Sequence, residues 1–278
     1  MVTVNSISGG KTSAYMALRI PADVNIYACV CIDYPPAAPK DPAVLQYCLH
    51  KLNGNFIASA ESKKTLKVIM DLEQALGQEI VWVRGKSFDQ IIDEAGCLPT
   101  WARRFCTTKL KIEPIFEYVY PRYGEVRMNI GFRADELDRI KKATENGSQL
   151  EYFHPVSCNL YGQNRQNWAV VRYGEKAFPL KRTFHYQVKN FLSDHFPGLI
   201  FPFDSNCKGC HHKSNELIKH NYQEEPEVLE WFALQEKKGK ANTWHDDQIP
   251  YEEIFKTDYY TLFPYAEHTM CNSGYCHD

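Results

Sequence analysis

The stretch Val2–Ser13, VTVNSISGGKTS, decides the fold. The apolar residues of Val2–Ile7 predict a strand, Ser8–Ser13 forms a turn rich in glycine and hydroxyl groups, and Ala14–Leu18 predicts the first turns of a helix. A strand, a glycine-rich turn and a helix in this order build phosphate sites. The glycines let backbone N–H groups approach an anion, and the helix N-terminus adds partial positive charge.

The side chains of this loop suit the same purpose. Hydroxyl groups can donate hydrogen bonds and Lys11 can add a full charge. The spacing differs from the GxxxxGK[ST] loop, because only Gly9 and Gly10 precede the lysine. The alternative is an ordinary Ser/Gly turn that caps a helix. We predict a phosphate-binding loop, in which the binding residues are Ser8, Gly9, Gly10, Lys11, Thr12 and Ser13.

Composition limits the possible classes of protein. The chain has 278 residues, of which 44% are hydrophobic, and a formal net charge of −2, so composition gives no sign of polyanion binding. It contains no apolar run long enough to span a membrane and no signal-peptide segment at its start, so we expect a cytoplasmic protein with no membrane partner. In a reducing compartment its 10 cysteines are expected to be thiols, metal ligands or catalytic groups.

Strands and helices alternate along the first half of the chain. The pattern predicts strands at Asn25–Ile32, Glu79–Val83 and Val126–Gly131, and helices at Asp41–Leu52, Ser62–Leu76 and Phe88–Ala95. This alternation is typical of an α/β fold with a mostly parallel, doubly wound sheet and helices on both faces. We predict that residues 1–150 form this domain.

The pattern changes after residue 150. Helices are expected at Thr183–Phe196 and Pro226–Lys238, and a strand at Trp168–Tyr173. The tail from Lys240 shows little periodicity. Residues 151–278 are therefore predicted to be an α-rich extension that contains cysteines.

Two further segments are expected at the carboxyl edge of the sheet. Asp33 follows the strand Asn25–Ile32 and precedes a proline-rich loop. In open α/β sheets, the carboxyl end of a strand faces the crevice in which ligands bind. Gly131 ends the predicted strand Val126–Gly131, and Arg133, just after it, can fork onto a phosphate or sulfate. The acids Asp135 and Glu136 could orient arginines or bind Mg²⁺. The alternative for this second segment is an ordinary helix start.

A basic stretch surrounds Cys106. Arg103 and Arg104 precede this cysteine, and Lys109 and Lys111 follow it. Such an environment would lower the pKa of the thiol or hold an anion. The alternative is a solvated basic face with one buried cysteine.

Seven of the nine remaining cysteines fall into two groups. Cys207 and Cys210 form a CxxC motif in which Gly209 allows a tight turn, and the chain end supplies Cys271 and Cys276. With Cys106, they favour a metal or Fe–S site over independent buried cysteines. The other group is predicted to be small core residues, namely Cys29, Cys31 and Cys48.

The motifs SGGKTS, FCTTKLKIEP, GFRADELDR and CKGC, in that order, resemble the PAPS reductase family of the PP-loop (HUP-like) adenine nucleotide hydrolases. The likeness is to the type common in phages and mobile elements. The resemblance implies ATP or PAPS at the carboxyl edge of the sheet, with Ser8–Ser13 on its phosphates and Arg133 on phosphate or sulfate. It also implies a [4Fe–4S] cluster, with Zn²⁺ as the alternative, held by Cys106, Cys207 and Cys210.

The chain departs from the family pattern at several positions. Its end, GYCHD, only loosely resembles the glutamate-cysteine-glycine-x-histidine tail of the reductases. Phe105 stands where cluster-binding members often have a second cysteine, and Thr12 stands where the loop usually has aspartate. Gly10 is typical of relatives that cleave ATP. The family is therefore better defined than the reaction.

Three functions remain open from the sequence. In a sulfonucleotide reductase, Cys276 attacks sulfur, Lys11 and Arg133 act on the bound nucleotide, and a thioredoxin-like donor supplies electrons. In an adenylating sulfurtransferase, the acceptor is a nucleobase, as in a nucleic acid. The third function is a nucleotide-binding module with structural zinc. The fourth metal ligand is expected to be Cys271, with Cys276 as the alternative, and the oligomeric state is not indicated.

Overall fold

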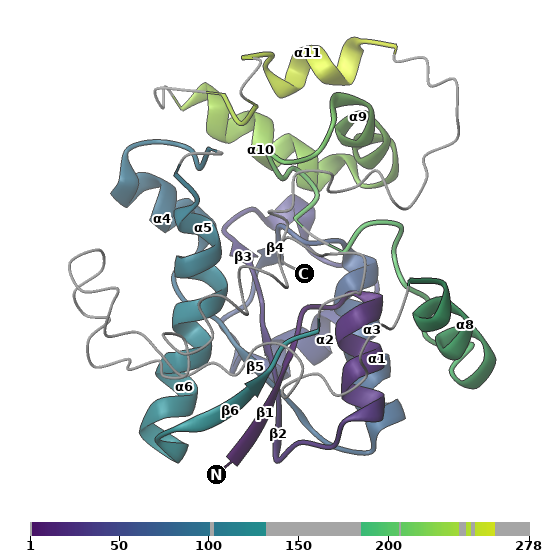
Figure 1. Ribbon diagram of the computed structural model, residues 1–278. Helices are drawn as coiled ribbons and strands as arrows, with labels where there is room; N and C mark the ends of the chain where they lie inside the picture. Colours follow the sequence, from purple (N-terminus) through teal and green to yellow (C-terminus); the bar gives the residue numbers. More distant parts are fainter. Residues whose placement is uncertain are drawn as a thin grey trace, which may run out of the picture.

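The computed structural model describes residues 2–100, 103–131, 185–205, 207–238, 243–245 and 248–258 (Figure 1). The predicted strand Trp168–Tyr173 lies outside these residues. So do five candidate site residues, which are Arg133, Asp135, Glu136, Cys271 and Cys276.

The centre of the molecule is a parallel sheet of four strands. These are β1 (Val2–Ile7), β2 (Val24–Ala28), β5 (Ile80–Val83) and β6 (Val126–Asn129), in the spatial order β5-β2-β1-β6. The predicted parallel α/β architecture is thus confirmed. The chain first builds outward from β1 to β5 and then returns to place β6 on the other side of β1. The order of the strands reverses between β1 and β6, and ligands bind at such a switch point in open α/β sheets.

Helices cover both faces of the sheet. Three of them, α1 (Lys11–Arg19), α2 (Pro42–Lys51) and α3 (Lys63–Leu76), share a core with Tyr27 of β2. On the other face, α6 (Glu113–Tyr123) packs against neighbouring residues of the same strand, such as Ile26. Successive residues of a strand point to opposite faces, so a strand buried on both sides is apolar throughout.

The predicted helix limits are close to those observed. Ser62 caps α3 through its side chain, and Gly77 ends the helix in the left-handed conformation. A capping box of Ser87 and Gln90 begins α4 (Phe88–Ala95), which ends at Gly96 as expected. Three short helical segments complete this half, namely η1 (Pro35–Ala37), α5 (Phe105–Thr107) and the π-helical η2 (Thr108–Ile112).

The prediction of one strand over Asn25–Ile32 is wrong in its second half. The parallel strand β2 ends at Ala28, and β3 (Cys31–Ile32) leaves the sheet to pair antiparallel with β4 (Ala58–Ser59). A tight hydrogen bond from Cys31 N to Cys29 O turns the chain at this point. Both halves of the apolar run are fully buried, so hydrophobicity does not mark the bend between them.

The later helices lie above the carboxyl ends of the strands or beside α1 in Figure 1. They are α8 (His185–His195), α9 (Asn215–Glu224), α10 (Pro226–Lys237) and α11 (Tyr251–Lys256). The structure confirms the first and third of these, whereas α9 and α11 were not predicted. An aromatic core formed by Phe88, Trp231, Phe232, Trp244 and Tyr251 joins α10 and α11 to α4. Across the described ranges, no helix has the length and apolar character needed to cross a membrane.

Candidate functional site

The loop after β1 has the backbone shape of an anion site. Gly9 has a left-handed φ of +78°, which favours glycine, and Gly10 is the extended residue that precedes α1. Gly10, the N-cap residue, has no side chain with which to cap this helix end. The first N–H groups of a helix have no partner within the helix, and together with the helix dipole they favour an anion.

The hydroxyl of Ser13 holds the loop in this shape. It accepts a hydrogen bond from Ser8 N at 3.1 Å and donates one to Gly10 O at 3.0 Å. The hydroxyls of Ser8 and Ser13 are also 3.1 Å apart. Ser13 and its neighbour Thr12 are buried. The sequence predicted these hydroxyls as ligand donors, and the structure shows that Ser13 is already engaged in shaping the loop.

Two glycines allow close packing around the loop. A Cβ atom at Gly9 would lie 2.4 Å from Cγ2 of Thr65 in the first turn of α3. A Cβ atom at Gly131 would lie 3.2 Å from both Cγ2 and the carbonyl oxygen of Thr12. The end of β6 therefore contacts the start of α1, which places Gly131 beside the glycine loop at the switch point.

Asp33 has contacts elsewhere. Its carboxylate accepts a hydrogen bond from the hydroxyl of Ser87, the cap of α4, and its N–H donates to Asp89 Oδ2 at 2.8 Å. Asp89 in turn accepts hydrogen bonds from Trp231 and Gln235 of α10. These contacts hold Asp33 at the α4–α10 junction, and its predicted contact with a nucleotide stays a prediction.

Three predicted metal ligands share one cavity. A space of about 60 Å³ is lined by Cys106, Cys207 and Cys210. The last two lie about 100 residues after Cys106 in the chain. Val30, just beyond β2, also lines it, so the cavity lies beyond the carboxyl edge of the sheet, as the glycine loop does. Its other lining residues are Phe88, Arg104, Thr107, Leu110, Lys111, His211 and His212. We call this space the thiol cavity.

The predicted lowering of the thiol pKa is wrong for the protein without metal. Removal from water raises the pKa of all three thiols, that of Cys210 to about 11. Lys111 opposes this rise at each thiol, and Arg104 opposes it at Cys106 and Cys210, but the loss of hydration is larger. A bound metal cation would supply the missing stabilisation of thiolates.

His211 adds a nitrogen to the same cavity. Burial, together with the positive charge of neighbouring groups, lowers its pKa to about 3, so the ring is neutral. Its Nε2 atom is buried and has no hydrogen-bond partner among the described residues. Among all the residues that the structure describes, no group of three or more His, Cys, Asp or Glu side chains is arranged to hold a metal ion. The donor set of three thiols suits a thiophilic metal, but these residues alone do not complete its site.

The CxxC loop is held by its own contacts. A Cβ atom at Gly209 would lie 2.4 Å from the ring of Phe232, and the hydroxyl of Tyr251 donates to Gly209 O at 3.0 Å. Glycine was predicted here for a tight turn, and the structure adds the close approach of an aromatic ring. Lys208 is fully buried, with Nζ 3.1 Å from Asn221 Oδ1 and 3.3 Å from Glu224 Oε2.

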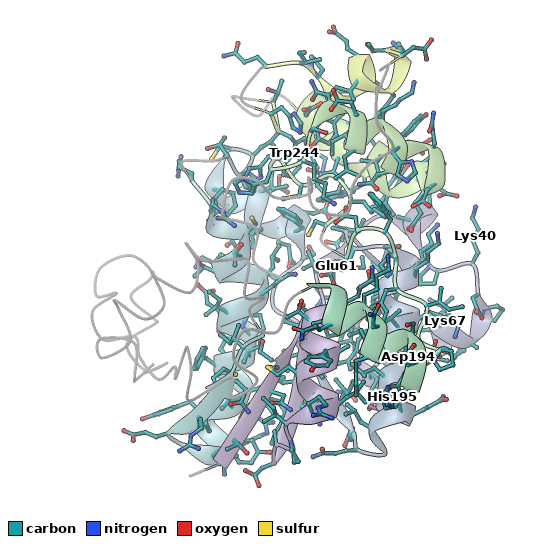
Figure 2. All side chains as sticks on the ribbon, turned by 45° about the vertical axis from the view of Figure 1, so that its right-hand side comes forward. Lys40, Glu61, Lys67, Asp194, His195 and Trp244 are labelled. Carbon is teal, nitrogen blue, oxygen red and sulfur yellow. The ribbon has the colours of Figure 1, made fainter. Side chains whose placement is uncertain are left out.

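Sequence reasoning missed Glu61. This carboxylate is fully buried, lies 3.0 Å from Lys111 Nζ and accepts a hydrogen bond from the hydroxyl of Tyr27. Figure 2 shows Glu61 in the interior, between the sheet and the upper helices. In the sequence, an acid next to Ser62 looks like an ordinary residue before a helix. The strand before it and the serine cap after it are features of the structure that the sequence analysis did not predict.

Comparisons of the chain with protein-family models, with curated proteins and with solved structures found no match.

Proposed function

We propose that this chain is a PP-loop enzyme that binds an adenine nucleotide and carries out sulfur chemistry. The observation that carries the proposal is that the glycine loop and the three thiols lie at the same edge of one parallel sheet. A site that joins a phosphate-binding loop to clustered thiols suits a reaction between a nucleotide and sulfur.

The nucleotide is proposed to bind at the switch point between β1 and β6. Backbone N–H groups of Gly9, Gly10 and the start of α1 would surround its phosphates, and Lys11 would add charge. Because Gly131 has no side chain, its backbone can lie close to Thr12 at the start of α1. Arg133, two residues further on, is proposed to contact phosphate or sulfate, as the family resemblance implies.

The favoured reaction is reduction of PAPS or adenylyl sulfate. The thiolate of Cys276 would attack sulfur, form an S–S bond and displace the nucleotide as the leaving group. A dithiol donor of the thioredoxin type would then attack the cysteine sulfur, release sulfite and become oxidised to its disulfide. Cys106, Cys207, Cys210 and Cys271 would hold a [4Fe–4S] cluster or Zn²⁺, with Cys276 as the alternative fourth ligand. Such a group would keep its cysteine ligands as thiolates and would tie the segments that carry them together.

The thiol cavity also favours a second function. Three thiols and Lys111 line one cavity, and this function needs no nucleophile from the tail. The chain would then adenylate a carbonyl oxygen, for example on a nucleobase, with release of pyrophosphate. A donor at the oxidation level of sulfide would attack the activated carbon, form the C–S bond and displace AMP, which carries the oxygen away. A nucleotide-binding module with structural zinc and no turnover is the third candidate.

Assays on protein purified without oxygen separate these functions. Sulfite release from PAPS with a thioredoxin-type donor supports the reductase, and pyrophosphate release from ATP supports the sulfurtransferase. ATP or PAPS binding by calorimetry without either product supports the binding module. Failure to bind either nucleotide would overturn the proposal. Iron and zinc analysis, with an absorption spectrum, identifies the metal.

Serine variants decide the role of the tail. If Cys276→Ser abolishes turnover and keeps its metal, Cys276 is the nucleophile. If Cys276→Ser loses metal while Cys271→Ser keeps it, Cys276 is the fourth ligand and the reductase loses its nucleophile.

A further inference from the structure

Residues 60–65, with the sequence AESKKT, connect β4 to the first turn of α3. Ala60, Glu61, Ser62 and Thr65 are each 0% exposed, although three of them are polar. Connecting segments usually run over the surface, because buried polar groups are costly unless they are hydrogen-bonded. We call these residues the 60–65 segment.

One end of the segment supports the glycine loop. Gly9 packs so closely on Thr65 that a Cβ atom would lie 2.4 Å from the threonine methyl group and 3.6 Å from Ile69 Cδ1. The backbone that is proposed to surround phosphates therefore rests directly on the first turn of α3. A shift of the glycine loop on ligand binding would press on this turn, because packed cores resist compression.

The other end of the segment holds the wall of the thiol cavity. Ala60 O accepts a hydrogen bond from the N–H of Lys208, inside the CxxC motif, at 2.8 Å. Glu61 Oε1 lies 3.0 Å from the ammonium group of Lys111, which lines the cavity. One buried carboxylate thus fixes a cation that faces the thiols, while the neighbouring carbonyl fixes the loop that carries two of them.

The middle of the segment is tied to the later helices. The hydroxyl of Ser62 and the N–H of Lys63 both donate to the carboxylate of Glu225, which joins α9 to α10. This carboxylate also lies 3.9 Å from Lys208 Nζ. A negative group from the second half of the chain therefore occupies the N-terminus of α3, where negative charge is favourable.

We propose that the 60–65 segment couples nucleotide binding at the glycine loop to the accessibility of the thiol cavity, with Glu61 as the positioning residue for Lys111. The inference rests on the proposed function in one respect, namely that a nucleotide binds at the glycine loop. Bound nucleotide stabilises the packed arrangement of the loop and α3, and local openings that expose the cavity become rarer. Coupling between sites is reciprocal, so modification of the thiols weakens nucleotide binding by the same factor.

The test measures alkylation of individual cysteines by iodoacetamide in metal-free protein, with and without saturating ATP, using mass spectrometry. We expect ATP to slow the alkylation of Cys207 and Cys210 about fivefold or more, near the lower end of couplings between sites. Cys97, which follows α4, is the internal control and is expected to keep its rate. Calorimetry on the same samples measures ATP binding.

Variants distinguish coupling from direct shielding by the ligand. In Glu61→Gln, ATP is expected to bind with little change while its effect on the two thiols is lost. Glu73→Gln is the matched control, because Glu73 lies near the other end of α3 and pairs with Lys51 at 2.6 Å. It is expected to behave like the wild type. If Glu61→Gln does not fold, Ser62→Ala removes one hydroxyl from the same segment and should also reduce the effect.

Each other outcome has a defined meaning. Equal slowing in Glu61→Gln and wild type would show that ATP covers the thiols directly and would overturn the coupling. Binding of ATP without any slowing in the wild type would overturn the coupling and leave the proposed function intact. If ATP does not bind, the same measurement is made with PAPS, and failure of both nucleotides to bind would overturn both proposals.

Discussion

The glycine loop and the thiol cavity lie at the same edge of the sheet but are assembled in different ways. The loop is a continuous stretch, Ser8–Ser13, whose shape depends on local hydrogen bonds and on one helix, α3, beneath it. The cavity is formed by four separate parts of the chain, namely Val30, Phe88, residues 104–111 and residues 207–212, and its walls depend on the Lys111–Glu61 ion pair and on aromatic packing. A local site can be recognised from sequence, whereas a site assembled from distant segments needs the fold.

The strongest test of this contrast is Gly9→Ala. The left-handed φ and the 2.4 Å approach to Thr65 both oppose a side chain, so we expect a loss of about 2–4 kcal/mol in unfolding free energy and loss of nucleotide binding. Urea unfolding and calorimetry with ATP measure the two effects.

Gly54→Ala is the matched control for Gly9→Ala. Gly54 has the same φ of +78°, but a Cβ atom there would meet nothing within 4 Å. Its cost should be about 1 kcal/mol, from backbone strain alone, with ATP affinity unchanged. Equal effects of the two substitutions would contradict the packing of Gly9 on α3. Adding Thr65→Ser, which removes the methyl group, should partly rescue Gly9→Ala.

The second prediction tests charge at the glycine loop. Lys11→Met keeps much of the aliphatic stem and removes the ammonium group, so ATP binding should weaken by about 1.5–3 kcal/mol while stability changes little. Lys67→Met on α3 is the control, because Lys67 pairs with Asp71 on an exposed helix face (Figure 2). The same loss in both variants would indicate a general effect of protein charge.

The glycine loop and the thiol cavity also show which features could be predicted from the sequence and which could not. The strand–loop–helix unit was predicted because its parts are contiguous, and the end of α4 was predicted because Gly96 stops the helix. The bend after Ala28 was missed, since apolar residues lie on both sides of it. Glu61 was missed because its partners, Tyr27 and Lys111, are 34 and 50 residues away.

The cysteines illustrate the same limit. Cys207 and Cys210 were paired by their spacing, but Cys106 was joined to them by family resemblance, and only the structure places all three around one cavity. The sign of the thiol pKa shift was also missed. A sequence displays the charges of Arg104 and Lys111, whereas the extent to which a thiol loses water depends on packing.

The third prediction concerns the cavity alone. Gly209→Ala forces the ring of Phe232 to move, because three ring atoms lie within 2.7 Å of the added Cβ position. We expect a loss of about 1–3 kcal/mol in stability and a reduced metal content, with ATP affinity retained. Gly198→Ala, where a Cβ atom meets nothing within 4 Å, should change neither stability nor metal content. Unchanged metal content in Gly209→Ala would show that metal binding does not depend on the contact between Gly209 and the ring of Phe232.

The smallest effect is expected at a cysteine outside both sites. Cys48 is 0% exposed in the core that α2 shares with the sheet, and burial raises the pKa of its thiol to about 12, so it acts as a small apolar side chain. Cys48→Ala should cost about 1 kcal/mol of stability through lost packing and leave metal content and ATP affinity unchanged. Cys207→Ala is the contrasting variant, for which loss of metal is expected with ATP affinity kept within about twofold, because alanine removes the sulfur without adding bulk to the cavity. Loss of metal in Cys48→Ala would mean that the core thiols belong to the metal site. It would also remove the contrast between a cysteine that only packs and one that lines the cavity.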